Sequence, residues 1–330
     1  MNKNVGILIA GIIVIALICG GVYYGVTRNN IGILSDGQKS KSGEMVVNSN
    51  DTEEDFVIGE REAFYTDDDY PVVDGSTATI PLAEAFEAEF KAKSVNDVNI
   101  KHSTTHPAYE RLISGEVDLI LVTYPSEEEF KMAEKAGVEL EITPVVNEAF
   151  VFYNNILNPV KSLTFEQIQK IYTGEITNWK EVGGEDLPIK AYQREPNSGS
   201  QTGILKLVMK GLKMMDAPVE DIIGEMFSII SLVSDYDNGK NAIGYSYYYY
   251  ATTMYDIMDK EIADRIHLLG VNGIEPNNQT IKDGSYPIRT NYYIVINAAE
   301  PEGSPARVLK DRMLGERGQK AAEAVGYVGM

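Results

Sequence analysis

From about residue 71 to the C-terminus, hydrophobic and polar positions alternate between strand-like and helix-like patterns. The run VDLILVTY at 117–124 is apolar at most positions, as is typical of a strand buried in a parallel sheet. The stretch IPLAEAFEAEFKAK at 80–93 has apolar residues three and four positions apart, which predicts a helix. The pattern predicts a strand in 70–77, a helix in 80–93, a strand in 95–103, a helix in 106–115 ending at Gly115, and a strand in 117–124. This order indicates an α/β fold with a mostly parallel sheet.

The second half of the chain continues the alternation without any internal repeat. The expected elements are a strand in 147–155, a helix in 164–174, a strand in 188–194, strands in 242–251, 265–270 and 286–297, and a helical segment in 304–326. After Arg194, the stretch REPNSGSQTGILKLVMKGL becomes a helix. The residues expected on its apolar face are Ile204, Leu205, Val208, Met209 and Leu212.

The N-terminal segment differs from the rest, because Val5 to Val26 is a run of uncharged residues flanked by Lys3 and Arg28. A run of this length suits an uncleaved transmembrane signal-anchor. A lipoprotein signal with lipid on Cys19 is the alternative. The expected divisions are an anchor or lipoprotein signal at 1–27 and a flexible acidic tether at 28–64, whose composition does not support a packed core. The bulk of the chain is then expected on the extracellular face of the cell membrane.

Composition narrows the functional classes. The 330 residues carry a formal net charge of −20, which argues against a nucleic-acid-binding protein. With Cys19 as the single cysteine, no intramolecular disulfide can form. No Walker loop, H-E-x-x-H motif or G-x-S-x-G elbow is present, so neither enzymatic activity nor a cofactor is expected. His102 and His106 are four residues apart, a spacing that suits two metal ligands on one face of a helix. Pro107, however, marks the start of a helix, so His102 belongs to the strand before it and no metal site is expected.

Small and hydroxyl-bearing residues precede three of the predicted helices, in DGSTATIPL at 74–82, STTHPAYERL at 103–112 and REPNSGSQT at 194–202. The start of a helix presents unpaired backbone N–H groups and a partial positive charge, which attract anions. In open α/β sheets such helix starts meet at the carboxyl edge of the strands. Arg194 adds a guanidinium suited to bidentate contact with an oxyanion. Three separate helix caps would also explain the hydroxyls, but would leave Arg194 without a role.

The stretch from Asn158 to Thr202, NPVKSLTFEQIQKIYTGEITNWKEVGGEDLPIKAYQREPNSGSQT, resembles the phosphate-binding proteins of ABC phosphate importers (PstS-like, with a type II periplasmic-binding-protein fold). The resemblance covers roughly residues 72–330, and AIGYSYYYY and YPIRTNYYIVIN match later landmarks of the family. It implies two α/β lobes that close on a ligand about a hinge. The first lobe would comprise 66–150 with 287–330 returning through the hinge, and the second lobe 151–286.

The resemblance also implies a set of ligand-binding residues. Oxyanion contacts are expected at the first helix start, before the second helix, after the third strand, and at the arginine with its Ser-Gly-Ser cluster. These positions are Thr79, Ile80, Thr104, Thr105, Thr123, Arg194, Ser198, Gly199 and Ser200.

Thr123 departs from the family pattern, since the resemblance implies an aspartate there that accepts the proton of hydrogen phosphate. A hydroxyl can also accept a hydrogen bond, so Thr123 stays among the expected contacts. The identity of the oxyanion is left open by this change. Glu148 could supply a carboxylate from the hinge strand, but a salt bridge on the hinge surface is the expected role for it.

The resemblance therefore implies a monomeric receptor that captures inorganic phosphate, or a related tetrahedral oxyanion, and passes it to an ABC transporter permease. The net charge does not exclude this function, because charges beyond about 10 Å are screened at physiological salt. Two alternatives stay open from the sequence. One is a membrane-tethered sensor or surface module of the same fold without transport, and the other is a hydrolase acting on phosphate esters.

Overall fold

A computed structural model of the chain describes residues 63–330 except 99, 225, 236–238 and 255–258. The expected membrane anchor, Cys19 and nearly all of the expected tether lie outside the described residues. Within the described part, no helix combines the length and apolar character needed to cross a membrane.

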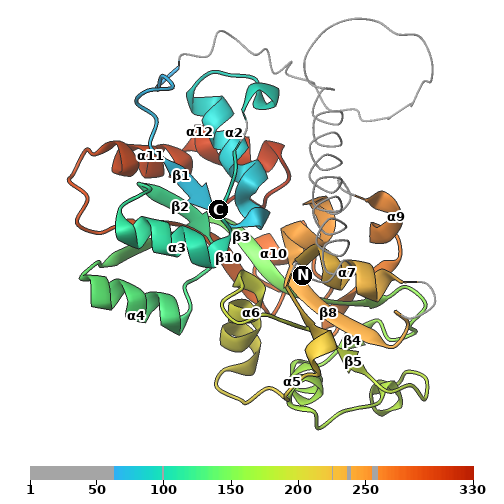
Figure 1. Ribbon diagram of the computed structural model, residues 1–330. Coiled ribbons are helices and arrows are strands. Elements are labelled where there is room, and N and C mark those ends of the chain that lie inside the picture. Colours follow the sequence, from blue (N-terminus) through green and yellow to red (C-terminus); the bar gives the residue numbers. More distant parts are fainter. Residues whose placement is uncertain (1–62, 99, 225, 236–238, 255–258) are drawn as a thin grey trace, which may run out of the picture.

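The protein has two α/β lobes joined by the long strand β3 (Leu140–Asn155), which runs through both of them (Figure 1). Strand β3 pairs with β10 (Arg289–Asn297) from Leu140 to Ala149, and then with β8 and β9 from Phe150 onward. A single continuous sheet therefore carries the order β1-β2-β10-β3-β8-β5, with β9 and β4 branching from β3. The pairs made by β3 and β10 are antiparallel, whereas the outer pairs β1–β2, β5–β8 and β4–β9 are parallel.

The first lobe packs helices around β1, β2 and the adjoining parts of β3 and β10. Its elements are β1 (Val73–Gly75), α2 (Ile80–Phe90), α3 (Thr105–Ser114), β2 (Leu119–Val122), α4 (Glu127–Ala136), α11 (Pro305–Leu314) and α12 (Glu316–Ala324). Two 3-10 turns, Thr77–Thr79 and Val95–Asp97, complete it. Strand β2 is fully buried, as its unbroken apolar run predicts.

The second lobe is built on β8 and β9. Its strands are β4 (Ser162–Leu163), β5 (Lys190–Ala191), β8 (Ala242–Tyr247) and β9 (Ile266–Val271), with a separate ladder of β6 (Gln193–Arg194) and β7 (Ile222–Ile223). Its α-helices are α5 (Phe165–Thr173), α6 (Gly199–Gly203), α7 (Met226–Ser234), α9 (Lys260–Ala263) and α10 (Asn278–Lys282). It also contains π-helices at Ile204–Met209 and Tyr250–Met254, and 3-10 turns at Trp179–Val182 and Val219–Asp221.

Aromatic side chains dominate the core of the second lobe. Phe150 and Phe152 of β3 stack in tilted and edge-on contacts with Tyr245 and Tyr172, at centroid separations of 5.5 to 6.3 Å. Trp179 is fully buried and donates its indole N–H to Asn241 O at 2.8 Å. Such pairs stabilise a core beyond the apolar area they bury.

Most of the predicted elements are present, but three expectations were wrong. Residues 95–103 form no strand in the part that is described; Asp97 and Val98 instead donate backbone hydrogen bonds to Ser94 and Val95, closing a tight turn. The strand expected at 188–194 is split into β5 and β6.

The third difference lies in the helix that follows Arg194, where the expected apolar face is only partly buried. Ile204, Val208 and Met209 are buried, whereas Leu205 and Leu212 are 45% and 47% exposed. The wider winding of the π-helix and its end at Lys210, which is left-handed with φ 50°, turn these two side chains away from the core.

The start of the described chain is held against the first lobe. The ring of Phe64 lies under two guanidinium groups, at 3.7 Å from Arg312 and 4.6 Å from Arg317. A few residues on, Asp67 pairs with Lys91 and Lys93, which directly follow α2. Cation–π contacts and ion pairs thus attach residues 64–67 to the side of the lobe formed by α2, α11 and α12.

Candidate functional site

The Ser-Gly-Ser segment forms the start of α6, as its sequence predicts. Ser198 is extended at the N-cap and its hydroxyl accepts the backbone N–H of Gln201 at 3.3 Å. Gly199 and Ser200 are the first helical residues and both are buried. Because α6 continues directly into the π-helix Ile204–Met209, these residues begin one continuous helical segment, 199–209, which we call the helical rod.

Arg194 is buried at the end of β6, where its guanidinium is fixed by three hydrogen bonds. Nε donates to Ile223 O at 2.9 Å and Nη2 donates to Gly224 O at 2.7 Å. Nη1 donates to the hydroxyl of Ser200 at 3.2 Å, which brings the guanidinium to the first turn of α6. Burial lowers the pKa of Arg194, but a guanidinium stays protonated in proteins. Of its five N–H groups, these bonds leave donors on both terminal nitrogens for a further partner.

Residues from the two lobes meet at Gly199. A Cβ atom on this glycine would lie 2.8 Å from Thr123 Oγ1 and 2.9 Å from Thr105 Oγ1, so only glycine fits at this approach. Thr123 Oγ1 is buried without a hydrogen-bond partner of good geometry among the described residues, and the Tyr247 hydroxyl lies beside it. Three of the predicted site residues, from the loop after β2, from α3 and from α6, therefore converge.

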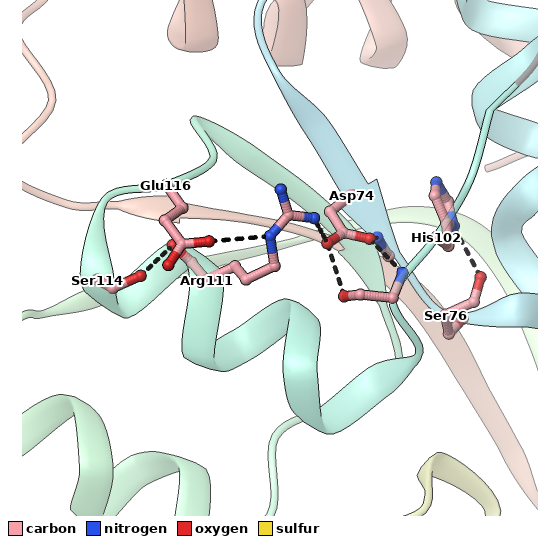
Figure 2. Close-up of polar contacts among 8 residues, drawn as sticks. Asp74, Ser76, His102, Arg111, Ser114 and Glu116 are labelled. Carbon is pink, nitrogen blue, oxygen red and sulfur yellow. Dashed lines mark hydrogen bonds and ion pairs between the residues drawn. The ribbon is translucent and has the colours of Figure 1, made fainter.

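A buried carboxylate positions the loop that delivers Thr104 and Thr105, as Figure 2 shows around Asp74. Asp74 accepts hydrogen bonds from the backbone N–H of Gly75 and of Ser103, both at 2.7 Å, and pairs with Arg111 of α3. Burial acts to raise the pKa of Asp74, but these hydrogen bonds outweigh it and the pKa is lowered. The charged form of Asp74 thus ties the end of β1 to the start of α3.

Thr104 has a backbone conformation that few residues other than glycine adopt. As N-cap of α3 it has φ 80° and ψ 170°. Such a conformation costs a β-branched residue about 1–3 kcal/mol and persists only where surrounding contacts impose it. Here the Asp74 contacts to the preceding Ser103 and the helix that follows impose it, which marks this loop as a candidate binding element.

The first predicted helix start is arranged differently from the other two. The Thr79 hydroxyl donates to backbone carbonyls, Leu121 O of β2 at 2.6 Å and Ser76 O of its own loop at 2.9 Å, and the N–H of Ile80 donates to Thr77 O. The described contacts therefore do not place the Thr79 hydroxyl or the Ile80 amide in the cluster around Gly199. Nearby, His102 Nδ1 lies 2.8 Å from Ser76 O, with the two residues facing each other in Figure 2.

Two tyrosines of β8, which the sequence did not indicate as site residues, also support the site. Tyr247 donates its hydroxyl to Gly199 O at 3.0 Å, and Tyr245 accepts the backbone N–H of Arg194 at 3.0 Å. Burial raises the pKa of both phenols, which stay protonated. The signal that could have revealed them is their i, i+2 spacing in a strand, which places both rings on one face of the sheet.

A further contact joins the lobes at the mouth of this cluster. Asn197, whose φ is 63°, lies in the turn before α6 and donates its side-chain amide to Glu128 of α4. Glu128 belongs to the acidic first turn of α4, capped by Ser126. The loop bearing Ser198 is thus also held against the first lobe.

The expectation of a surface salt bridge for Glu148 was wrong. This side chain is buried at the point where β3 changes partners from β10 to β8. Its carboxyl accepts the N–H of Ala149 at 2.8 Å and that of Tyr249 at 3.3 Å. Burial raises the pKa of Glu148 to about 8, although these hydrogen bonds act in the opposite direction. Glu148 is therefore an internal residue of the hinge.

His106 lies between two carboxylates and is not part of a cluster of possible metal ligands. Its Nδ1 lies 3.1 Å from Glu129 Oε1 and its Nε2 lies 3.9 Å from Glu110. Across the described ranges, no group of three or more His, Cys, Asp or Glu side chains could hold a metal ion.

With this geometry established, comparison with known proteins identifies the family. A family model described as the PBP superfamily domain matches residues 65–310, well over half of the chain. The chain belongs to the PBP superfamily. The two-lobed α/β architecture predicted from the sequence is confirmed by this match and by the structural comparisons below.

Curated relatives within the PBP superfamily cover most of the described chain. The phosphate-binding protein PstS of Staphylococcus saprophyticus is 28% identical over 273 residues, which cover 78% of this chain and 79% of that protein. The phosphate-binding protein PstS of Bacillus subtilis is 26% identical over 220 residues, or 66% of each protein. The predicted resemblance to PstS-like proteins is thereby confirmed.

Solved structures show the same superfamily fold. A structure from Clostridium perfringens with bound phosphate, assigned as a phosphate ABC transporter substrate-binding protein, has a TM-score of 0.59 at 26% identity. It covers 78% of this chain, and the match extends over 98% of the other. An ABC-type phosphate transport receptor from Vibrio cholerae has a TM-score of 0.58 at 21% identity and supports the fold.

Proposed function

We propose that this PBP superfamily member is an extracytoplasmic receptor that captures inorganic phosphate between its two lobes and delivers it to an ABC importer. The observation that carries the proposal is the meeting of Thr105, Thr123 and Gly199, with Arg194 bound to the adjacent Ser200. Its relatives support the same function, because they are named as phosphate-binding proteins and one structure contains bound phosphate.

Each part of the cluster supplies a contact suited to an oxyanion. Arg194 offers the remaining donors of a fixed guanidinium, and charge-assisted bonds of this kind are about twice as strong as neutral ones. The Thr105 and Thr123 hydroxyls supply donors from the opposite lobe, and the first turn of the helical rod supplies backbone N–H groups. An anion bound by both lobes stabilises the closed arrangement relative to the open one. Ser198 and Thr104 belong to the proposed site as the N-caps of α6 and α3. Thr79 and Ile80, whose hydroxyl and amide donate elsewhere, are left out of it.

Thr123 bears on which oxyanion is bound. A buried threonine can either donate or accept a hydrogen bond, whereas a carboxylate only accepts. Hydrogen phosphate has a proton to donate and sulfate has none, so a threonine discriminates between them less strongly than a carboxylate. We therefore infer a receptor for tetrahedral oxyanions that binds phosphate and rejects sulfate only weakly.

The wider biological setting follows from the proposed role. The receptor would act as a monomer on the extracellular face of the cell membrane, held by an N-terminal helix or by lipid on Cys19. The partner that receives the ligand would be an ABC transporter permease. No turnover of substrate is expected, because the cluster is built from hydrogen-bond donors and includes no general base placed on a nucleophile.

Calorimetric titration of the full-length chain in mild detergent tests the proposal. Phosphate, arsenate and sulfate would each be titrated at several values from pH 5 to pH 8, which spans the second ionisation of phosphate. Binding of phosphate in the micromolar range or tighter is expected, with sulfate weaker but measurable. No binding of phosphate at any of these pH values would refute the proposed function, and hydrolysis of a phosphomonoester would show an enzyme instead.

A further inference from the structure

A small cavity lies between the lobes, next to the cluster around Gly199. Its volume is about 30 Å³, which is room for roughly two water molecules. The lining comes from both lobes and from the linking strands: Tyr124 follows β2, Tyr293 and Thr290 belong to β10, and Tyr247 belongs to β8. Thr202, Gly203, Lys206 and Leu207 of the helical rod supply the remaining wall.

The cavity adjoins the proposed anion site through shared residues. Tyr247 lines the cavity and also donates its hydroxyl to Gly199 O at 3.0 Å. Tyr124 directly follows Thr123 in the chain. Along the rod, Gly203 lies one turn beyond Gly199, a rise of about 5.4–6 Å. A group attached to the bound anion by one or two bonds would therefore reach this space.

Lys206 gives the cavity its chemical character. Its ammonium lies over the ring of Tyr124, in a cation–π contact. Among the described residues it has no carboxylate partner. Partial burial lowers the pKa of Lys206 to about 8, so the ammonium remains mainly protonated at pH 7.

The remaining polar groups of the lining would also favour an anionic or accepting substituent. Thr202 offers a hydroxyl, the Thr290 hydroxyl is hydrogen-bonded to that of Tyr293, and the ring of Tyr293 meets that of Tyr124 edge-on at 5.5 Å, closing one side. The cavity therefore offers an ammonium without a carboxylate partner, next to a hydroxyl donor, in a space that holds about two waters. One carboxylate group fits both its size and its charge.

We propose that this cavity, with Lys206, Tyr124 and Thr290, is a second subsite that binds the carboxylate of a small phosphonate or phosphate ester whose phosphorus group occupies the Gly199 cluster. The proposal rests on the proposed function, since it requires an oxyanion at that cluster. It extends the ligand class from inorganic phosphate to short carboxylated organophosphorus compounds.

Titration of the full-length chain at pH 7 with three ligands tests the subsite. Phosphate reports the anion site alone, methylphosphonate adds a substituent without charge, and phosphonoacetate adds a carboxylate on one carbon. The variant Lys206→Met removes the ammonium, and Lys210→Met is its matched control. Lys210 is in the same segment and lies over the ring of Phe165 at 5.0 Å, outside the cavity.

Wild-type protein is expected to bind phosphate and phosphonoacetate, the latter more tightly than methylphosphonate. Lys206→Met should weaken phosphonoacetate by at least about tenfold and change phosphate and methylphosphonate by less than about threefold. Lys210→Met should leave all three within about threefold of wild type. Lys206 is exposed in part, so a thermal melt is expected to show an intact fold.

Two results would overturn the inference while the proposed function stands. One is phosphate binding without phosphonoacetate binding. The other is an equal loss of phosphate and phosphonoacetate affinity in Lys206→Met, which would make Lys206 a general source of positive charge. Failure of every ligand, phosphate included, would instead refute the proposed function and the subsite with it.

Discussion

Gly199 lies so close to Thr105 that a Cβ atom on the glycine would come within 2.9 Å of the threonine hydroxyl. The two residues belong to different lobes, and they meet only because the helical rod of the second lobe abuts the first turn of α3. Because the two residues approach so closely, a single methyl group added at Gly199 is expected to keep the two lobes from closing fully.

Gly199→Ala is expected to weaken phosphate binding by at least about tenfold, because its methyl group would collide with the Thr105 and Thr123 hydroxyls on closure. Isothermal titration would measure the affinity. Gly315→Ala is the control, since a Cβ atom there would meet its nearest neighbours at an ordinary 3.4 Å. Unchanged affinity in Gly199→Ala would contradict a ligand held between these residues.

Arg194→Lys is expected to abolish measurable phosphate binding although it conserves the charge. An ammonium cannot keep the bonds to Ile223 O and Gly224 O while also reaching Ser200 and a ligand. Leaving these carbonyls unpaired should also lower the free energy of unfolding by about 1–3 kcal/mol. Titration and urea unfolding would measure the two effects. Arg265→Lys, at an exposed pair with Glu261, is the control that should change neither.

Thr123→Asp is expected to improve the preference for phosphate over sulfate by about tenfold or more, because a carboxylate accepts the proton of hydrogen phosphate and repels an acceptor-only anion. Competition titrations at pH 6 and pH 8 would measure the ratio. Thr123→Val, which removes the hydroxyl but preserves the shape, should weaken both anions alike. An unchanged ratio in the aspartate variant would place the ligand away from residue 123.

Glu148 is expected to make stability fall as pH rises. Its folded pKa of about 8 exceeds the ordinary 4.5, so between these values the folded protein keeps a proton that the unfolded chain releases. The stabilisation is complete below about pH 4.5 and is lost toward pH 8, with a slope of at most about 1.4 kcal/mol per pH unit. Urea unfolding of wild type and Glu148→Gln across this range would test it. The glutamine variant should lack this slope, and identical slopes would contradict the shift.

Thr104→Gly is expected to raise the free energy of unfolding by about 1 kcal/mol, because glycine adopts φ 80° and ψ 170° without the penalty that a β-branched residue carries. The gain is reduced by the larger conformational entropy of glycine in the unfolded chain. Thermal and urea unfolding would measure it. Destabilisation would show instead that contacts of the threonine side chain outweigh the strain.

Much of the fold could be predicted because local signals and burial agree. Strand β2 is apolar and buried throughout, α5 has Thr164 as N-cap and ends at Gly174 in a left-handed conformation, and α3 ends at Gly115 in the same way. Where backbone groups close a local turn in place of a strand ladder, prediction was wrong, as in the turn at Val95–Asp97.

The candidate site was predictable in part, for a related reason. Motifs at helix starts indicate Thr105, Arg194 and Gly199, and the resemblance adds Thr123. Sequence spacing contains no signal for the burial of Glu148, because that depends on β3 exchanging β10 for β8 at this point. Nor does it reveal that Lys206 reaches back to Tyr124, since that contact joins segments distant in the chain.

The arginine contacts of Phe64 have a mechanical consequence. Any pull on the chain from before this residue is transmitted through Arg312 and Arg317 to α11 and α12, and through Asp67 to the end of α2. None of these elements carries Arg194 or Ser200. In a protein attached at its N-terminal side, the first lobe would therefore be held in place. The second lobe, which carries Arg194, would be the one that moves as the two lobes close.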